Sequence, residues 1–167
     1  MEFKTNRLEI KPIMPEDKEY VLDLVTDEIV GKTYMFPVFQ NRGDAEPLFA
    51  RLVELSKDDN RYVAGVYLDG RFIGMMNAVE IKDGKVEMGY AYLPDFYNRG
   101  YATEAFKGAI AYLFEHGFTA VLAGAFSENA ASMRVMEKCG MTRQDYTEDI
   151  DYRGVTHTCI YYAIQNM

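Results

Sequence analysis

Residues 62–93 carry the pattern that most restricts how this chain can fold. Within them, three segments have the period of two that is typical of strands: Tyr62–Leu68, Arg71–Ile81 and Lys85–Leu93. Asp69-Gly70 stands between the first two segments, and Asp83-Gly84 between the last two. Asp-Gly is typical of two-residue hairpin turns, because both turn residues need positive φ angles. The pattern predicts three antiparallel strands connected as a meander.

One strand and two helices are expected before the meander. Residues 7–11 alternate polar and apolar side chains, which indicates a strand. Pro15 fits the first turn of a helix, and the two acidic residues after it favour the positive end of the helix dipole. Asp44 is expected to cap a second helix. Residues 29–43, between the helices, are rich in Gly, Pro and aromatic residues and predict an irregular segment.

After the meander, expected helices and strands alternate. A helix from Tyr101 to His116 follows a loop and ends at Gly117. A buried strand, another helix and a final hairpin come next: Phe118–Phe126, Asn129–Cys139, and Met141–Asp149 with Val155–Ile164. The order β-α-α-β-β-β-α-β-α-β-β predicts an α/β fold with three α/β/α layers and a mixed, mostly antiparallel sheet. We expect one domain over residues 1–167, because no linker or repeat interrupts the pattern.

Charge and cysteine content narrow the classes of partner. The formal net charge is −8, which disfavours nucleic acid and anionic lipid as partners and agrees weakly with a cationic partner such as an amine. The preferred alternative is that the charge only keeps the protein in solution. Cys139 and Cys159 match no metal-binding spacing, so free thiols and no metal are expected. No apolar run approaches the ~20 residues of a membrane span. The N-terminus lacks the apolar core of a signal peptide. We therefore expect a cytoplasmic protein.

The stretch 98–103, Asn-Arg-Gly-Tyr-Ala-Thr, lies between an expected strand and an expected helix. Gly100 and Ala102 leave room for a ligand to approach the backbone. The helix N-terminus presents unpaired N–H groups and partial positive charge, and Arg99 can add a charged contact. These features suit a pyrophosphate. An ordinary strand-to-helix turn is the alternative, because short turns with Gly are common.

Residues 90–105 closely resemble the acetyl-CoA signature of the GNAT superfamily, most of all the branch with the ribosomal-protein N-terminal (alanine/serine) acetyltransferases. Further segments agree with that branch in the same order: residues 5–10, 15–17, 129–132 and 137–141. The resemblance implies a GNAT-like fold and an N-acetyltransferase with acetyl-CoA as cosubstrate. The acceptor would be a primary amine, on a protein N-terminus or a small molecule, and the protein a monomer or homodimer.

The resemblance also implies cofactor-binding residues. The backbone of one strand end would pair with the pantetheine arm, at Ala91, Tyr92 and Leu93. Backbone amides of the loop and helix start would hold the pyrophosphate, at Arg99, Gly100, Tyr101, Ala102 and Thr103. Asn129 would contact the pantetheine side, and Ser132 would lie near the thioester sulfur. Two positions depart from the family pattern: Tyr97 replaces a common Gln or Arg, and Met136 replaces a catalytic Tyr.

Acetyl transfer to an amine needs a base and a donor to the leaving thiolate. Glu87 is the candidate base, directly or through a water, and Glu80 is a weaker rival. Ser132 is the candidate donor to the thiolate. Structural alternatives remain for both candidates: a solvated strand carboxylate and a helix-capping serine. For His116 we expect a role at a helix C-terminus, while His157 stands on a late strand that borders the expected acceptor site.

Two functional alternatives remain beside the enzyme. One is a regulatory or partner-binding module that binds CoA but has lost catalysis, which the Met136 departure keeps open. The other is a nucleotide-phosphate enzyme, which is disfavoured because the loop lacks the Gly-Lys-Ser/Thr of a P-loop and no GxGxxG is present. The acceptor would be selected by residues 29–43 and by the late hairpin, because loops carry specificity.

Overall fold

The computed structural model describes all 167 residues. Its helices are α1 (Lys18–Thr26), α2 (Glu46–Lys57), α3 (Tyr101–Glu115) and α4 (Ala130–Lys138). Its strands are β1 (Phe3–Lys4), β2 (Leu8–Lys11), β3 (Val63–Leu68), β4 (Arg71–Lys82), β5 (Lys85–Tyr92), β6 (Ala120–Phe126), β7 (Thr142–Tyr152) and β8 (Val155–Gln165). None of the helices is both long and apolar enough to span a membrane.

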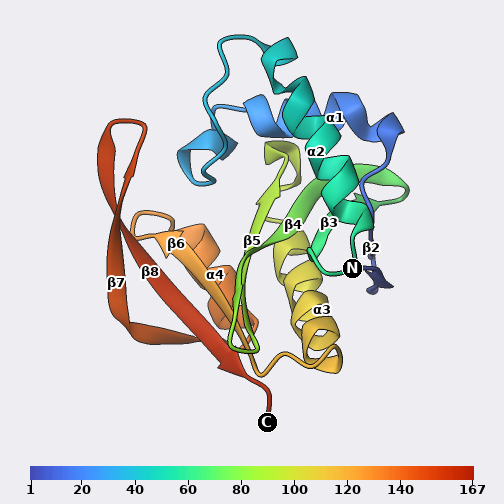
Figure 1. Ribbon diagram of the computed structural model, residues 1–167. Helices are drawn as coiled ribbons and strands as arrows, with labels where there is room; N and C mark the ends of the chain where they lie inside the picture. Colours follow the sequence, from blue (N-terminus) through green and yellow to red (C-terminus); the bar gives the residue numbers. More distant parts are fainter.

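All the strands form one sheet in the order β1-β2-β3-β4-β5-β6-β8-β7 (Figure 1). Every neighbouring pair is antiparallel except β5 and β6. At both expected meander turns the Asp and the Gly have positive φ: 49° and 79° at Asp69-Gly70, and 51° and 72° at Asp83-Gly84. The mixed, mostly antiparallel sheet is thus confirmed.

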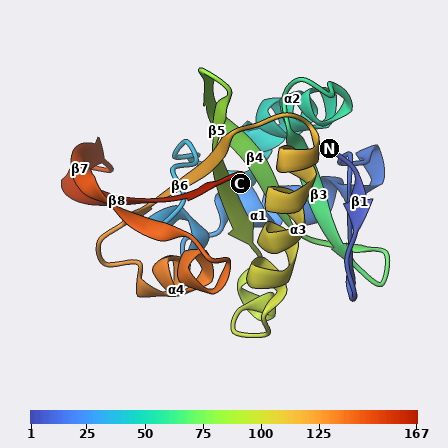
Figure 2. The same ribbon diagram turned by 90° about the horizontal axis from the view of Figure 1, so that it is seen from below.

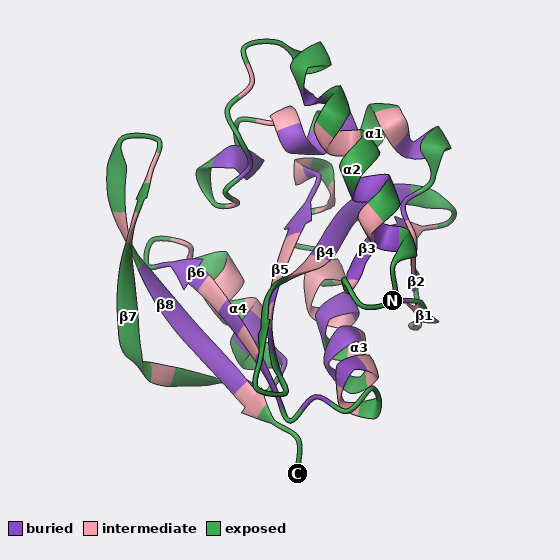
Figure 3. Cartoon of the chain, viewed as in Figure 1, coloured by how far each residue is buried: buried purple, intermediate pink, exposed green.

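Helices cover both faces of the sheet, and α2 and α4 lie on opposite sides of it in Figure 2. β4 supplies side chains to both cores: Phe72 and Met75 pack with α1 and α2, whereas Ile73 and Met76 pack with α3 and α4. A bulge opposite Val66 and Tyr67 of β3 shifts the alternation of β4 by one residue between these pairs. Figure 3 shows the buried residues on the inner strands and inner helix faces, with β7 exposed along most of its length. The three α/β/α layers are confirmed.

The sheet opens between β5 and β6. Only three residue pairs join these parallel strands: Lys85 with Ala120, Val86 with Val121, and Glu87 with Leu122. Beyond Glu87 the two strands separate towards their C-terminal ends (Figure 1). The outer edge of β5 from Met88 to Tyr92 therefore has no strand partner on that side.

Two local expectations change. The chain has one more strand than expected, because Phe3–Lys4 folds back on β2 through a tight turn closed by the Thr5 N–H and the Leu8 carbonyl, 2.9 Å apart. Two residues are too few to show a strand period. Asp44 does not cap α2, whose N-cap is Ala45. The Asp44 carboxylate instead accepts the Asn41 N–H at 3.3 Å and closes a 3₁₀ turn before the helix.

Candidate functional site

A cavity of about 1000 Å³ occupies the opening between β5 and β6. Both halves of the sheet contribute to its wall through β4, β5, β6, β7 and β8. The rest of the wall comes from α4, residues 29–35, and the loop and first turn of α3. The strand divergence is what makes room for it, since paired strands lie only about 4.8 Å apart.

The loop before α3 presents backbone amides to this cavity. Asn98 and Gly100 have φ angles of 59° and 80°, so the chain turns sharply before the helix. The first helical bond runs from the Glu104 N–H to the Gly100 carbonyl, at 3.0 Å. The amides of residues 101–103 precede that bond, so they have no partner within the helix. Gly100 and these three residues line the cavity, and their arrangement suits an anion.

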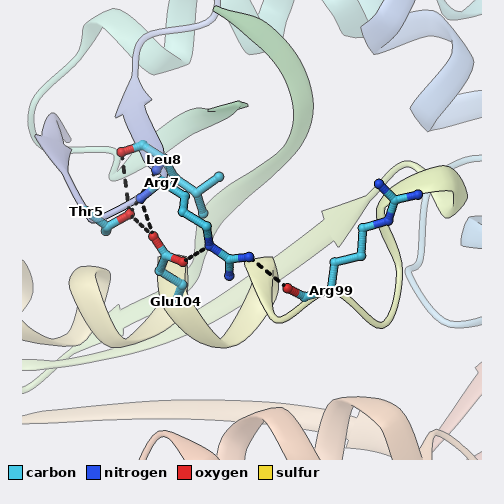
Figure 4. A network of polar contacts seen from close by, with 5 residues as sticks. All are labelled: Thr5, Arg7, Leu8, Arg99 and Glu104. Atoms are coloured by element: carbon cyan, nitrogen blue, oxygen red, sulfur yellow. Dashed lines mark hydrogen bonds and ion pairs between the residues drawn. The ribbon is translucent and has the colours of Figure 1, made fainter. Parts of the chain in front are cut away.

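Arg99 contributes differently from the other loop residues. Its side chain is exposed and is not part of the cavity wall. Figure 4 shows it extending away from α3. Its backbone carbonyl accepts a hydrogen bond from Arg7 at 3.1 Å. Arg99 therefore contributes to this loop through its backbone. Its guanidinium points away from the backbone amides of residues 101–103 (Figure 4).

The free edge of β5 faces the cavity with alternate peptide groups. The Leu93 N–H donates to the Ile73 carbonyl of β4 at 2.9 Å, so this amide points away from the opening. Because amide directions alternate along a strand, Tyr92 presents its amide to the opening. Ala91 and Tyr92 line the cavity, whereas Leu93 packs in the core. The Tyr92 hydroxyl is buried and has no hydrogen-bond partner.

The first turn of α4 stands across the cavity from β5. The Asn129 side-chain oxygen caps the helix by accepting the Ser132 N–H at 3.2 Å, which leaves the Asn129 amide nitrogen as a donor. The Ser132 hydroxyl lies 2.9 Å from the hydroxyl of Tyr90 on β5. Burial raises the pKa of Tyr90 more than the Ser132 hydrogen bond lowers it, so the phenol stays protonated. Met136, in the same helix, is fully buried.

Three carboxylates gather at the other end of the cavity. Glu87 is half-buried and lies directly opposite Glu80 of β4. Glu148 of β7 completes the group and accepts a hydrogen bond from the Tyr161 hydroxyl at 2.8 Å. Burial, followed by the charges of Glu80 and Glu148, raises the pKa of Glu87. A carboxyl group in this setting binds a proton more readily than a solvated one.

The segment after α1 and the β7–β8 hairpin meet over the cavity. The Tyr152 hydroxyl, at the end of β7, donates to the Gly31 carbonyl at 2.7 Å and lies 3.2 Å from the Tyr34 carbonyl. The Tyr34 hydroxyl donates to the side-chain oxygen of Asn77 on β4. Tyr34 and Asn77 both line the cavity. The segment and the hairpin expected to shape the acceptor site are thus joined to each other.

Several side chains of this site lack a sequence pattern that would single them out: Arg7, Tyr34, Asn77, Tyr90 and Tyr152. Each reaches the site by a contact more than 40 positions away in the chain. The two histidines lie outside the cavity wall. His116 stacks on Tyr112 at the end of α3, and His157 pairs with Glu128 and stacks on Phe126.

Sequence comparison identifies related proteins. The acetyltransferase (GNAT) domain family matches residues 7–142. An FsC-acetyl coenzyme A-N(2)-transacetylase from Aspergillus fumigatus is 27% identical over 149 residues, which are 83% of this chain and 63% of that protein. This chain therefore spans less than two thirds of that relative. The uncharacterized N-acetyltransferase YnaD of Bacillus subtilis is 30% identical over 150 residues, covering 87% of this chain and 85% of YnaD.

Structural comparison agrees. A GNAT-family acetyltransferase from Bacillus anthracis has a TM-score of 0.84 and 28% identity, covering 99% of this chain and 98% of that one. A ribosomal-protein-S5-alanine acetyltransferase from Vibrio fischeri has a TM-score of 0.81 and 15% identity, covering 99% of this chain and 97% of that one. The resemblance drawn from residues 90–105 and the fold that it implies are both confirmed.

Proposed function

This chain is an acetyltransferase of the GNAT family, and from that premise we propose that it transfers acetyl from acetyl-CoA to a primary amine by direct attack in a ternary complex. One observation carries the proposal. The same cavity has an amide-lined helix start at one end and a half-buried carboxylate at the other. Such a site can hold an anionic donor and a protonatable acceptor at the same time.

Acetyl-CoA would lie along the opening in the sheet. Its pyrophosphate would bind the amides from Arg99 to Thr103, because these have no helix partner and meet the positive end of the α3 dipole. Its pantetheine arm would pair with the free edge of β5 at Ala91 and Tyr92, as a further strand would. The Asn129 side chain would approach the arm from the α4 side.

The reaction needs a neutral amine, whose ammonium form has a pKa near ~10. Glu87 would take the proton from the ammonium, and the raised pKa of this carboxyl matches that role. The amine would then attack the thioester carbonyl, forming the C–N bond and breaking the C–S bond, and the proton that the nitrogen loses would neutralise the departing CoA thiolate. Ser132 would donate a hydrogen bond to that thiolate, with Tyr90 supporting the serine hydroxyl from 2.9 Å.

The acceptor would be a cationic amine, because Glu80, Glu87 and Glu148 lie together at this end of the cavity. It would be enclosed by residues 29–35 and the β7–β8 hairpin. A CoA-binding module without catalysis is the second candidate, favoured by the buried Met136 where many family members carry a tyrosine. Thiol release from acetyl-CoA with a panel of N-terminal peptides, polyamines, amino acids and aminoglycosides separates the two, since a pure binder releases no thiol.

Gly100→Val tests the cofactor site. Gly100 lines the cavity, valine disfavours its φ of 80°, and an added Cβ would lie 3.4 Å from the Arg7 guanidinium, so the substitution distorts the loop backbone. Acetyl-CoA binding should be lost by calorimetry while circular dichroism still shows a folded protein. Gly117→Val is the matched control, because Gly117 ends the same helix with a φ of 91° and has open space around it. Unchanged affinity in Gly100→Val would refute the proposed site.

A further inference from the structure

One carboxylate ties the N-terminal segment to the first turn of α3 (Figure 4). The Glu104 oxygen Oε1 accepts the Thr5 hydroxyl at 2.6 Å and the Arg7 backbone N–H at 2.7 Å. The second oxygen, Oε2, pairs with Arg7 Nε at 2.7 Å. The Glu104 side chain is only 18% exposed, so these contacts are partly shielded from solvent.

Arg7 extends this contact to the loop before the helix. Its Nη1 donates to the Arg99 carbonyl at 3.1 Å, and its guanidinium lies 4.5 Å from the centre of the Tyr101 ring. One side chain therefore touches the carboxylate of the first helical turn, the loop backbone and the first helical residue. Arg7 itself is not part of the cavity wall.

The bond to the Arg99 carbonyl fixes the direction of an amide. The Arg99 carbonyl and the Gly100 N–H belong to the same planar trans peptide, so they point in opposite directions. Gly100, at one end of this peptide, has a φ of 80°, which residues other than Gly rarely adopt. Holding the carbonyl with Arg7, which lies outside the cavity wall, keeps the Gly100 N–H turned away from Arg7.

The negative charge of Glu104 would repel an anion bound at the start of α3, and Arg7 offsets that repulsion. Burial alone raises the pKa of this carboxyl, but hydrogen bonds from Thr5 and Arg7 outweigh burial and lower it. Glu104 is therefore a negative charge within one helical turn of the proposed pyrophosphate amides. The adjacent Arg7 guanidinium, 2.7 Å from the carboxylate, offsets its repulsion of an anion.

We propose that Arg7 is a positioning residue for the pyrophosphate of acetyl-CoA: it orients the peptide between Arg99 and Gly100 and neutralises Glu104. This inference rests on the proposed cofactor role of the loop. It assigns a function to a residue that lies more than 90 positions before the loop and outside the cavity.

Arg7→Met tests the inference by calorimetry with CoA. We expect the Kd of CoA to rise on the order of 10-fold, as for the loss of one charged hydrogen bond. The kcat at saturating acetyl-CoA should stay unchanged, because Arg7 touches no reacting group. Arg42→Met is the matched control: Arg42 is 40% exposed against 41% for Arg7, and it also pairs with carboxylates, those of Glu19 and Asp23. Its Kd should equal that of the wild type.

Two further variants separate orientation from charge. Arg7→Lys keeps the charge beside Glu104 but cannot bond both partners of the guanidinium, so its Kd should lie between those of the wild type and Arg7→Met. Adding Glu104→Gln to Arg7→Met removes the unpaired carboxylate and should recover part of the affinity. Melting curves check that each variant is folded.

The outcomes distinguish this inference from the proposed function. A wild-type protein that does not bind CoA overturns the proposed function. A wild-type protein that binds CoA, with a folded Arg7→Met that binds it equally well, overturns the role of Arg7 alone. A drop in kcat at saturation with unchanged Kd contradicts it too, because a positioning role for the pyrophosphate acts on binding.

Discussion

The carboxyl of Glu87 lies between two other carboxylates, and this setting has opposite effects on activity and on folding. Burial and the charges of Glu80 and Glu148 raise its pKa. A carboxyl whose pKa rises on folding stabilises the protein only below its ordinary pKa, and it loses that contribution as the pH rises through the raised value. Near neutrality the charged side chain therefore favours proton transfer but disfavours the folded state.

Glu87→Gln should lower kcat/KM near neutrality and recover partly at alkaline pH, where solvent has already deprotonated the amine. Its melting temperature near neutrality should equal or exceed that of the wild type, because the unfavourable charge is gone. Glu80→Gln is the control. It removes one charge that raises the pKa of Glu87, so the acid limb of its pH–rate profile should move to lower pH. Wild-type activity of Glu87→Gln at every pH would leave Glu87 a structural residue.

The contact between Tyr90 and Ser132 makes a second residue-scale prediction. Ser132→Ala should lower kcat on the order of 10- to 100-fold with little change in acetyl-CoA affinity. Tyr90→Phe keeps the ring packed on Phe106 and should lower kcat by a smaller factor. Within the Ser132→Ala background, Tyr90→Phe should have no further effect, because its hydroxyl acts through the serine. Additive losses in the double variant would show that the two hydroxyls act separately.

The amino-acid sequence alone was enough to identify candidate site residues that belong to a short, continuous sequence motif. Gly100 and the amides after it follow from a strand–loop–helix pattern, and Ser132 follows from the resemblance around Asn129. The partners of these residues could not be identified in this way. Tyr90 meets Ser132 from 42 positions away, and Arg7 meets the Arg99 carbonyl from 92 positions away. Only the packed sheet brings such pairs together.

At the scale of elements, the β7–β8 hairpin and the segment after α1 are joined by one phenol. Tyr152→Phe removes its hydroxyl from the Gly31 and Tyr34 carbonyls. We expect the KM for the amine to rise several-fold, because the enclosure of the acceptor loosens, while the Kd of acetyl-CoA stays unchanged. Thr156→Val is the control. It removes a hydrogen bond to Asp151 within the same hairpin, whereas the Thr156 side chain forms no hydrogen bond with the segment.

An unchanged KM in Tyr152→Phe would mean that the acceptor does not depend on this closure. If the Kd of acetyl-CoA also rose, the substitution would have disturbed the whole cavity, including the part that binds acetyl-CoA, and not the acceptor end alone. Measuring both constants on the same variant decides between these cases.

Elements with a clear period or turn signal were predictable, and so was the start of α4 at its cap Asn129, whereas the cap expected at Asp44 was wrong. The Asp-Gly turns placed β3, β4 and β5 within two residues of their observed bounds. The cap predicted at Asp44 was wrong because an acidic residue before a helix can close a preceding 3₁₀ turn as readily as it caps the helix itself. Its choice depends on Asn41 being in reach, which the residue type alone does not reveal.

At the scale of the whole molecule, the element order predicted the three layers but not the opening in the sheet. A β-α-β pattern indicates that β5 and β6 are parallel, and it does not say how many residues pair. Three pairs form here, and the strands separate beyond them. The size of the cavity is therefore a property of the folded molecule.

The strand order has a consequence for the growing chain on the ribosome. β1 to β5 follow one another in the sheet as they do in the sequence, so each can join its predecessor as it emerges. β8 lies between β6 and β7, so β7 cannot attach to the sheet until β8 has been synthesised. Once residue 93 has left the exit tunnel, the nascent chain contains β1 to β5 and therefore the β5 side of the opening. The side formed by β8 and its hairpin is absent until β8 has also left the tunnel.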